Sequence, residues 1–338
     1  MPAVIAELEN TIQHYAWGSH RFLAELCGRP VPAPEPEAEL WMGAHPKAPS
    51  RLHGEPLDKV IAREPEAMLG PDAAARFDGR LPFLFKLLAA GTPLSIQAHP
   101  NLDQAGEGFA RENAAGIPLD DPTRNYKDAN HKPEIICALS EFWGLNGFRP
   151  VDDILAQLDA VGLSALAEPT EGLRAEPTQA GLRRFFTAVM ALDAATQEGM
   201  IAALAATAAD RRDERPEYHW ICRGQEVFGN DVGLLCILLL NLVCLQPGQA
   251  MFCAAGDLHA YLGGFGVELM ANSDNVLRGG CTVKHVDVPE LERVLTFHAR
   301  PAAILTPQDG VGGIGTYDTP VDEFVLRALT VDAGCPEA

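Results

Sequence analysis

Short apolar runs separated by glycine and proline characterise the first part of the chain. The segments PFLFKLLAA and PLSIQAHP are each bounded by such residues, as the strands of a β-rich domain are. One helix is expected within this region, over residues 57–69. The pattern therefore predicts a mainly β domain over residues 1–150.

Residues 151–245 follow a helical period instead. The region is rich in alanine and leucine, and its apolar residues recur at the three- and four-residue spacing of a buried helix face. Residues 232–245 are apolar almost throughout, but about 14 residues are fewer than the roughly 20 that span a bilayer. We interpret this run as a buried helix with Asp231 as its N-cap. The region as a whole predicts a helical domain.

A β-like pattern with frequent glycines returns from residue 246 onward. We expect residues 246–290 to rejoin the N-terminal β domain, and the rest, to residue 338, to form a short C-terminal β region. The predicted fold class is thus mainly β, with a helical domain between two β-rich parts.

Acidic residues outnumber basic ones, 46 to 26, and give the 338-residue chain a formal net charge of −20. Nucleic acids and anionic membranes bind proteins through lysine and arginine, so this balance argues against both as partners. The N-terminal MPAVIAELENTIQ lacks the basic and apolar regions of a secretory signal. We expect a cytoplasmic protein that is a monomer or a weak homo-oligomer. An anionic substrate would need a locally basic site.

The eight cysteines include no C-x-x-C pair, which argues against a thiolate zinc site or a redox dithiol. Most of them lie in apolar runs. We interpret them as reduced, buried thiols that act as small hydrophobic residues and form no disulfides.

Two segments place candidate metal ligands on expected strands. Gln97 and His99 are two positions apart in a strand-like run, so both side chains point to one face. His259 opens another expected strand after a Gly-Asp turn. Taken singly, each of these residues is explained at least as well by a role in core packing, and glutamine is an uncommon ligand that spacing alone does not select.

The segment HKPE adds a carboxylate. Pro133 favours an extended backbone, which places Lys132 and Glu134 on one side and His131 on the other. Apolar residues follow Glu134, and a carboxylate at the edge of a buried strand needs a compensating cation or metal ion. A simple Lys–Glu pair explains this segment when it is taken alone. Together with the previous segments, however, two histidines and a carboxylate form a familiar catalytic zinc set with an open position.

The segment VELMANSDNVLRGGCTVKHVDV concentrates charged residues. Arg278 precedes a Gly-Gly pair that lets a ligand approach the backbone, and arginine and lysine are natural phosphate binders. Lys86 lies among phenylalanine and leucine in FLFKLL, where a lysine is costly to bury unless it is paired. With Lys132 and Lys284, these cations predict the locally basic site that an anionic substrate requires.

Several longer segments carry a family resemblance: QHYAWGS, ELWMGAHPKAPS, LPFLFKLLAAGTPLSIQAHPN, NHKPEIICAL, FWGLNGFR and GDLHAYLGGFGVELMANSDNVLRGG with the TVKHVDV that follows. In this order, over residues 12–289, they resemble type I mannose-6-phosphate isomerases. The resemblance implies cupin (jelly-roll) type β-barrels with a helical domain and a sugar-phosphate substrate. It also implies one Zn²⁺ per chain, held by Gln97, His99, Glu134 and His259, which departs from the common cupin motif with its ligands on one hairpin.

The same resemblance implies the remaining site residues. The catalytic group would comprise Arg278, Lys132, Glu268, His131, Lys284 and Asp274. The substrate-binding group would comprise Lys86, Tyr261, Trp17 and Ser95. The proton-transfer base stays open between Glu268, Lys132, Lys284 and His131.

The implied reaction interconverts D-mannose 6-phosphate and D-fructose 6-phosphate through an enediol. One alternative is a non-catalytic cupin that binds a metal ion or a sugar phosphate, and another is an iron-dependent cupin oxidase. The first is disfavoured because ligand and acid–base residues are both present, and the second because of the glutamine ligand and the many cations. Family members continue beyond EFVLRALTVD, so we expect an incomplete C-terminal barrel with unpaired strand edges.

Overall fold

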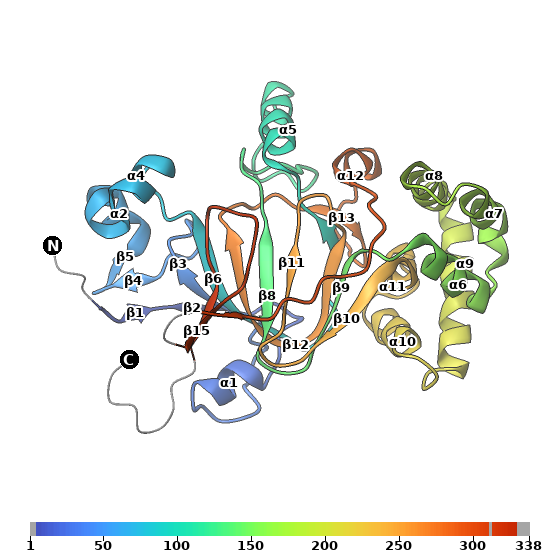
Figure 1. The fold of residues 1–338 in the computed structure, drawn as a ribbon, viewed down its shortest axis with the longest axis horizontal. Helices are drawn as coiled ribbons and strands as arrows, with labels where there is room; N and C mark the ends of the chain where they lie inside the picture. The colour runs from blue at the N-terminus through green and yellow to red at the C-terminus, as the bar shows by residue number, and fades with distance from the viewer. Residues whose placement is uncertain (1–4, 311–312, 330–338) are drawn as a thin grey trace.

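A ten-stranded sheet forms the centre of the computed structural model, which describes residues 5–310 and 313–329 (Figure 1). All of its strand pairs are antiparallel. The expected combination of a large sheet region and a helical block is confirmed. The strands of the central sheet are β2 (Thr11–Gln13), β3 (Glu39–Gly43), β6 (Phe83–Ala90), β7 (Ile96–Ala98), β8 (Glu134–Ala138), β9 (Phe142–Phe148), β10 (Leu240–Leu245), β11 (Ala250–Cys253), β12 (His259–Ala271) and β13 (Leu277–Gly280).

The longest of these strands, β12, joins two parts of the sheet. Residues 259–263 pair with β7 and β9, whereas residues 264–271 pair with β6 and β8. The change occurs at Gly264, whose φ is +125°. A Cβ atom at this position would lie 2.6 Å from the carbonyl oxygen of Glu141, so only glycine fits. One strand therefore carries functional residues of both parts of the sheet.

Local sequence explains where several strands begin. The predicted strands in PFLFKLLAA and PLSIQAHP correspond to β6 and β7. Pro82 directly precedes β6, and Pro93 lies three residues before the start of β7. β8 starts directly after Pro133, whose fixed φ favours extended backbone. On β3 the buried positions alternate along the strand, as expected for an element with one face toward the interior.

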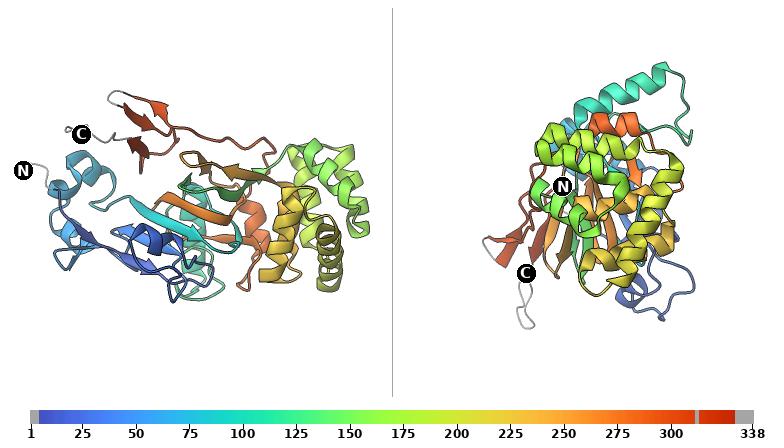
Figure 2. Two further views of the ribbon diagram at one scale, coloured as in Figure 1. Left: turned by 90° about the horizontal axis from the view of Figure 1, so that it is seen from below. Right: turned by 90° about the vertical axis from the view of Figure 1, so that its right-hand side faces the viewer.

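The helical block packs against one end of the sheet, at the right of Figure 1 and of the left view of Figure 2, and it faces the viewer in the right view of Figure 2. Its apolar stripes are buried as predicted, and Ile154, Leu182 and Leu204 are fully enclosed. The Thr178 and Asp193 side chains cap two of its helices by accepting backbone N–H bonds. The helices are α6 (Val151–Val161), α7 (Ala167–Ala175), α8 (Gln179–Met190), α9 (Ala194–Asp210) and α10 (Pro216–Phe228).

Two helix predictions were wrong in their extent. Residues 57–69 form α2 (Leu57–Arg63) and α3 (Pro65–Leu69), because the residue before a proline is displaced from helical geometry. Residues 232–245 form a 3₁₀ turn (Val232–Leu235), α11 (Cys236–Leu239) and then strand β10. Asp231 does cap the first turn, accepting the Gly233 N–H at 2.7 Å. The helical block therefore ends at α11, and β10 pairs with β9.

Smaller elements surround the sheet, and a separate three-stranded sheet follows near the C-terminus. Tyr317 anchors that small sheet by donating its hydroxyl to the Gly248 carbonyl oxygen at 2.7 Å. The rest of the expected C-terminal β region, residues 330–338, lies outside the described residues. The remaining elements are β1 (Leu8–Glu9), α1 (Phe22–Leu26), β4 (Arg51–Leu52), β5 (Glu55–Pro56), α4 (Pro71–Arg76), α5 (Leu102–Ala114), α12 (Val288–Val294), β14 (Gln308–Asp309), β15 (Ile314–Thr316) and β16 (Arg327–Leu329).

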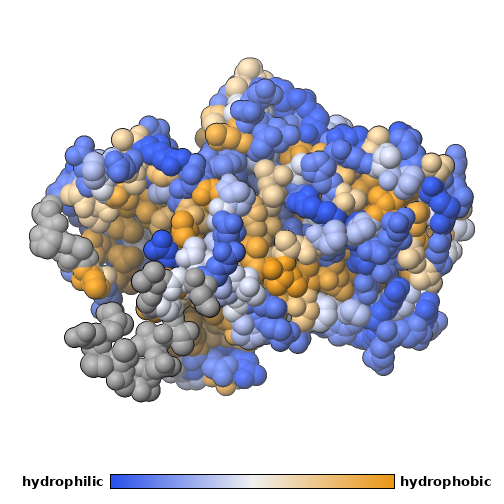
Figure 3. All heavy atoms as spheres, in the orientation of Figure 1, coloured by the Kyte–Doolittle hydropathy of each residue, from blue (hydrophilic) through white to orange (hydrophobic). Residues whose placement is uncertain are grey.

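The largest apolar core joins the helical block to the sheet, with Phe186, Leu235 and Leu258 among its buried members. Figure 3 shows hydrophilic residues over much of the outer helices. Apolar residues are visible near the middle of this face, where Figure 1 shows the central strands. No described helix has both the length and the apolar character that a membrane span needs. The seven described cysteines are free thiols, and five of them are buried as predicted. Cys27 is exposed and Cys244 is half-buried, so the expected burial was wrong for these two, and Cys335 lies outside the described residues.

Candidate metal centre and active site

Three buried side chains from different strands converge at the centre of the sheet. His99 follows β7, Glu134 begins β8 and His259 begins β12. The His99 Nε2 atom lies 3.5 Å from one Glu134 carboxylate oxygen, and the His259 Nε2 atom lies 3.3 Å from the other. Ligand atoms of the three residues are all within 4.8 Å of one another, which is compatible with one shared cation.

The hydrogen bonds of the two imidazoles leave their Nε2 atoms free for a metal ion. His99 Nδ1 lies 2.6 Å from the Asn275 carbonyl oxygen, and His259 Nδ1 lies 3.1 Å from that of Asp257. A carbonyl oxygen only accepts, so Nδ1 carries the proton and Nε2 keeps a lone pair. Both Nε2 atoms and Glu134 Oε2 are buried without a hydrogen-bond partner among the described residues. Such orphaned polar atoms are costly unless a cation satisfies them, so the donor set fits zinc.

Charge at this centre is balanced by Lys132, whose Nζ lies 2.7 Å from Glu134 Oε1. The predicted arrangement of Lys132 and Glu134 on one side of the extended segment is confirmed. Burial alone would raise the pKa of Glu134, but Lys132 and His99 outweigh it and hold that pKa well below its usual range. Burial, with Lys132 second, lowers the pKa of His99 to about 4, so its ring is neutral at neutral pH.

The sheet register places Gln97 beside the centre. Gln97 lies opposite His259 on β12 and opposite Arg278 on β13. Directly opposed residues of antiparallel strands project to the same face, so the three side chains form a row across the sheet. Arg278 is two strand spacings from His259, or roughly 10 Å. Metal binding by Gln97 stays a prediction.

Lys86 is buried between two carboxylates, on the face of the sheet that also carries Glu134. Its Nζ lies 2.7 Å from Glu268 and 3.4 Å from Glu39, and 5.5 Å from the Trp41 ring centroid. The expectation that this lysine must be paired is confirmed. Burial opposes its charge, but Glu268, Glu39 and Glu134 together raise the pKa of Lys86. Burial also raises the pKa of Glu268, although Lys86 acts against this shift.

A cavity of about 440 Å³ opens beside β13. Arg278 and Lys284 line it together with Arg124, Lys127 and Asp274. Burial lowers the pKa of Arg278, and burial followed by Arg278 and Lys47 lowers that of Lys284. Neither cation has an ion-pair partner within the described part of the chain, so both are available to an anionic ligand.

The other predicted site residues differ in their positions. His131 points to the C-terminal segment, with Nε2 2.5 Å from Glu323 Oε1. Asp274 forms an ion pair with Lys47 at 2.9 Å. Trp17 packs against the cluster that contains Tyr261, whose hydroxyl is buried without a partner among the described residues. Ser95 is partly buried just before β7. Their predicted roles stay predictions.

Sequence reasoning missed four residues of the segment ELWMGAHPKAPS. Glu39 and Trp41 reach Lys86 from β3, and His45 lies 3.7 Å from Asp274, which also binds Lys47. The available signal was the strand period, since Glu39, Trp41 and Gly43 share one face. A charged side chain on an inward face is costly to bury unless it is paired, so Glu39 pointed to a partner on that face.

Comparisons with known proteins agree with this geometry. The sequence model of the family described as phosphomannose isomerase type I, catalytic domain, matches residues 5–151. The mannose-6-phosphate isomerase of Salmonella typhimurium is 44% identical over 328 residues, covering 95% of this chain and 82% of its own.

Solved structures of such enzymes share the fold. A K86A mutant of phosphomannose isomerase from Salmonella typhimurium has a TM-score of 0.89 at 42% identity, over 96% of this chain and 83% of that one. A zinc-bound holo mannose 6-phosphate isomerase has a TM-score of 0.87 at 43% identity, over 95% and 82%. These values show that the fold is shared over nearly the whole of this chain.

Proposed function

This chain belongs to the type I phosphomannose isomerase family, and from that premise we propose the function of its site. The protein is a zinc-dependent aldose–ketose isomerase that interconverts D-mannose 6-phosphate and D-fructose 6-phosphate. The buried His99–Glu134–His259 triad, with its two free Nε2 atoms, is the observation that carries this conclusion. The family resemblance inferred from the sequence is confirmed.

Four residues would hold the zinc ion: Gln97, His99, Glu134 and His259. Once bound, a zinc ion at this position supplies a Lewis acid and a template for the oxygens of the open-chain sugar. The protein contributes the enclosure, since both histidines and the carboxylate are almost completely buried. Exclusion of water strengthens each electrostatic contact within the site.

Proton transfer between C1 and C2 requires a base beside the sugar chain. Glu268 is the strongest candidate, because its carboxylate is buried on the interior face and its pKa is raised. Lys86, held at 2.7 Å, would keep Glu268 in place and offset the negative charge of the enediol. Lys132 lies 2.7 Å from Glu134. It would hold this carboxylate in place and offset negative charge on the sugar beside the zinc site.

The phosphate group would bind at the cavity beside β13. Arg278 lies in the same row across the sheet as Gln97 and His259, so the phosphate end of the sugar and its metal-bound end would face the same side of the sheet. Lys284 lines the same cavity, and neither cation is neutralised by a carboxylate within the described residues. A chain of net charge −20 would in this way present a basic site to an anionic substrate.

Replacing Arg278 by alanine should lower kcat/KM for mannose 6-phosphate by about 10- to 100-fold, mainly through a higher KM. A hydrogen bond to a charged group contributes about 1.5–3 kcal/mol, which sets this range. Initial rates at varied substrate give both constants. Arg223→Ala, which removes a half-buried arginine of α10, is the matched control. An unchanged kcat/KM in Arg278→Ala would contradict the assignment.

Several finer statements belong to the same proposal. The sheet region is of cupin (jelly-roll) type, with residues 1–150 and about 246–290 forming the catalytic domain. The helical domain begins at residue 151 and ends with α11. Residues after 290 form a short C-terminal β region. The enzyme is cytoplasmic, a monomer or weak homo-oligomer, and takes no nucleic-acid or membrane partner. The acidic net charge supports the absence of nucleic-acid and anionic-membrane partners, because both bind proteins through lysine and arginine.

A coupled assay of fructose 6-phosphate formation tests the function directly. We expect activity in the zinc-loaded protein, its loss after chelation, and its return with Zn²⁺ but not with Mg²⁺, which prefers oxygen ligands. Circular dichroism would verify that the chelated protein stays folded. A folded, zinc-loaded protein without turnover would instead identify a binding protein.

A further inference from the structure

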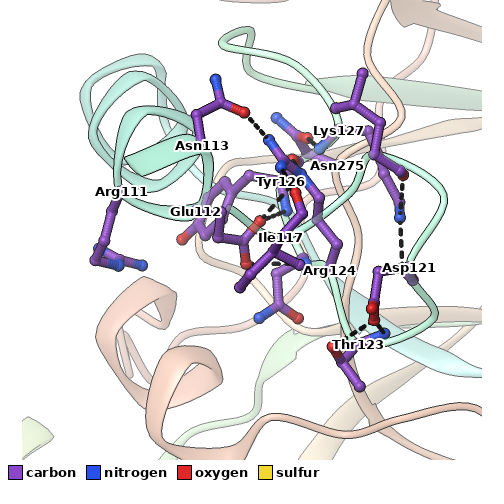
Figure 4. A network of polar contacts seen from close by, with 12 residues as sticks. Arg111, Glu112, Asn113, Ile117, Asp121, Thr123, Arg124, Tyr126, Lys127 and Asn275 are labelled. Carbon is purple, nitrogen blue, oxygen red and sulfur yellow. Dashed lines mark hydrogen bonds and ion pairs between the residues drawn. The ribbon is translucent and has the colours of Figure 1, made fainter. Parts of the chain in front are cut away.

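A polar network surrounds the loop between α5 and β8 (Figure 4). Arg124 is buried and donates to the Ile117 and Tyr126 carbonyl oxygens and to the Asn113 side chain. Glu112 accepts the Tyr126 backbone N–H at 2.9 Å. These contacts fix the loop on helix α5, and the loop continues into the segment that carries Lys132 and Glu134.

Asn275 joins this loop to the segment before β13. Its side-chain oxygen accepts the backbone N–H groups of Lys127 at 2.7 Å and Asp128 at 3.2 Å. Its side-chain nitrogen donates to the carbonyl oxygens of Asp128 at 2.9 Å and Asn130 at 2.8 Å. The residue is fully buried, at 0% exposure. Every hydrogen-bonding position of the amide is therefore used on one loop.

The main chain of the same residue contacts a metal ligand. The Asn275 carbonyl oxygen accepts the hydrogen bond from His99 Nδ1, at 2.6 Å. This contact sets the tautomer in which Nε2 is free, and it fixes the plane of the ring. Because the side chain clamps residue 275 from the other side, the carbonyl oxygen has little freedom to move away from His99.

We propose that Asn275 is a positioning residue for the zinc site, acting through the His99 Nδ1 hydrogen bond and through the loop that leads to Glu134. Asn275 joins two ligand-bearing segments. Its main-chain carbonyl oxygen holds His99 at the end of β7, and its side-chain amide holds residues 127–130, which lead to the start of β8. This inference rests on the proposed zinc site and adds a residue to it. Groups that orient metal-bound histidines typically contribute 10- to 100-fold to metal affinity.

The test compares zinc affinity in Asn275→Ala with that of the unmodified enzyme, by competition with a chromogenic chelator. We expect the dissociation constant to rise about 10- to 100-fold. At saturating Zn²⁺, kcat should recover to within about threefold, because the ligands themselves are intact. In the metal-free protein, two-bond ¹H–¹⁵N NMR should report a mixture of His99 tautomers in place of the Nδ1–H form.

Gln157→Ala provides a matched control for general destabilisation. Gln157 is also buried, at 8% exposure, and its side chain accepts from Arg215 at 2.9 Å within the helical block. Its replacement should lower the Tm without changing zinc affinity. Equal zinc affinity in Asn275→Ala and the unmodified enzyme, or an equal loss in Gln157→Ala, would overturn the inference. If the unmodified enzyme bound no zinc, the proposed function would fail first.

Asn275→Asp keeps the test decisive if the alanine variant does not fold. The aspartate retains the acceptor for the Lys127 and Asp128 N–H groups but loses both donors. An added carboxylate would by itself attract Zn²⁺, so weaker zinc binding in the folded variant is the direction that lost positioning predicts and that the added charge alone does not. Unchanged or tighter binding in folded Asn275→Asp would count against the proposal.

Discussion

Glu134→Ala should yield a folded chain that retains no zinc after dialysis and turns over mannose 6-phosphate more than about 100-fold more slowly. The lower bound comes from the loss expected when only an outer contact of a metal site is removed. Glu134 is the one carboxylate of the buried triad, and each of its oxygens faces one histidine Nε2 atom, at 3.5 and 3.3 Å. Without it, two imidazoles and the Gln97 amide would remain to bind a divalent cation.

Metal content by mass spectrometry and the coupled isomerase assay measure both parts of this expectation. Glu214→Ala, which removes an exposed carboxylate paired with Arg211, is the control and should keep one zinc per chain. Glu134→Gln retains the shape and one neutral oxygen, so its zinc affinity should be intermediate. Stoichiometric zinc at unchanged affinity in Glu134→Ala would place the metal centre elsewhere in the chain.

Local rules predicted those parts of the site that depend on a few neighbouring residues. Pro133 forces an extended segment, and Lys132 and Glu134 accordingly meet at 2.7 Å. The cost of burying an unpaired lysine predicted partners for Lys86, although not which ones. The strands in PFLFKLLAA and PLSIQAHP were also predicted from neighbouring residues, because the glycines and prolines that flank them end regular structure.

Pairings across the sheet were beyond sequence reasoning. Residues 240–245 belong to an apolar run without a clear period, and they become strand β10 because β9 offers a partner. Glu39 reaches Lys86 only because β3 and β6 pair in one register, Trp41 opposite Lys86. Likewise the row Arg278–Gln97–His259 exists through two strand pairings that no local spacing encodes. For the ligand set, the family resemblance supplied what spacing could not.

Glu268→Gln should lower kcat by about 10²- to 10⁴-fold, the usual contribution of a general base, while zinc content stays at one per chain. Glutamine keeps the size of the side chain and can still accept a hydrogen bond from Lys86. It cannot take a proton from the sugar carbon. KM should change little, because no phosphate contact is lost.

The pH profile gives the same prediction a second readout. Burial raises the pKa of Glu268, and a base acts only in its deprotonated form. The rate of the unmodified enzyme should therefore fall as the pH decreases through that raised pKa, and the fall should be absent in Glu268→Gln. A profile that keeps the same acidic limb in the variant would assign the titration to another group.

Glu39→Gln separates a base from a mere counter-ion. Glu39 is the second carboxylate on Lys86, at 3.4 Å against 2.7 Å for Glu268, and the substitution is equally conservative. If the carboxylates serve only to keep Lys86 charged and in place, both variants should lose activity to a similar, small extent. If Glu268 is the base, Glu39→Gln should lose less than about tenfold, below the range expected for Glu268→Gln. Equal losses would transfer the role of base to a lysine, with Lys132 beside Glu134 the next candidate.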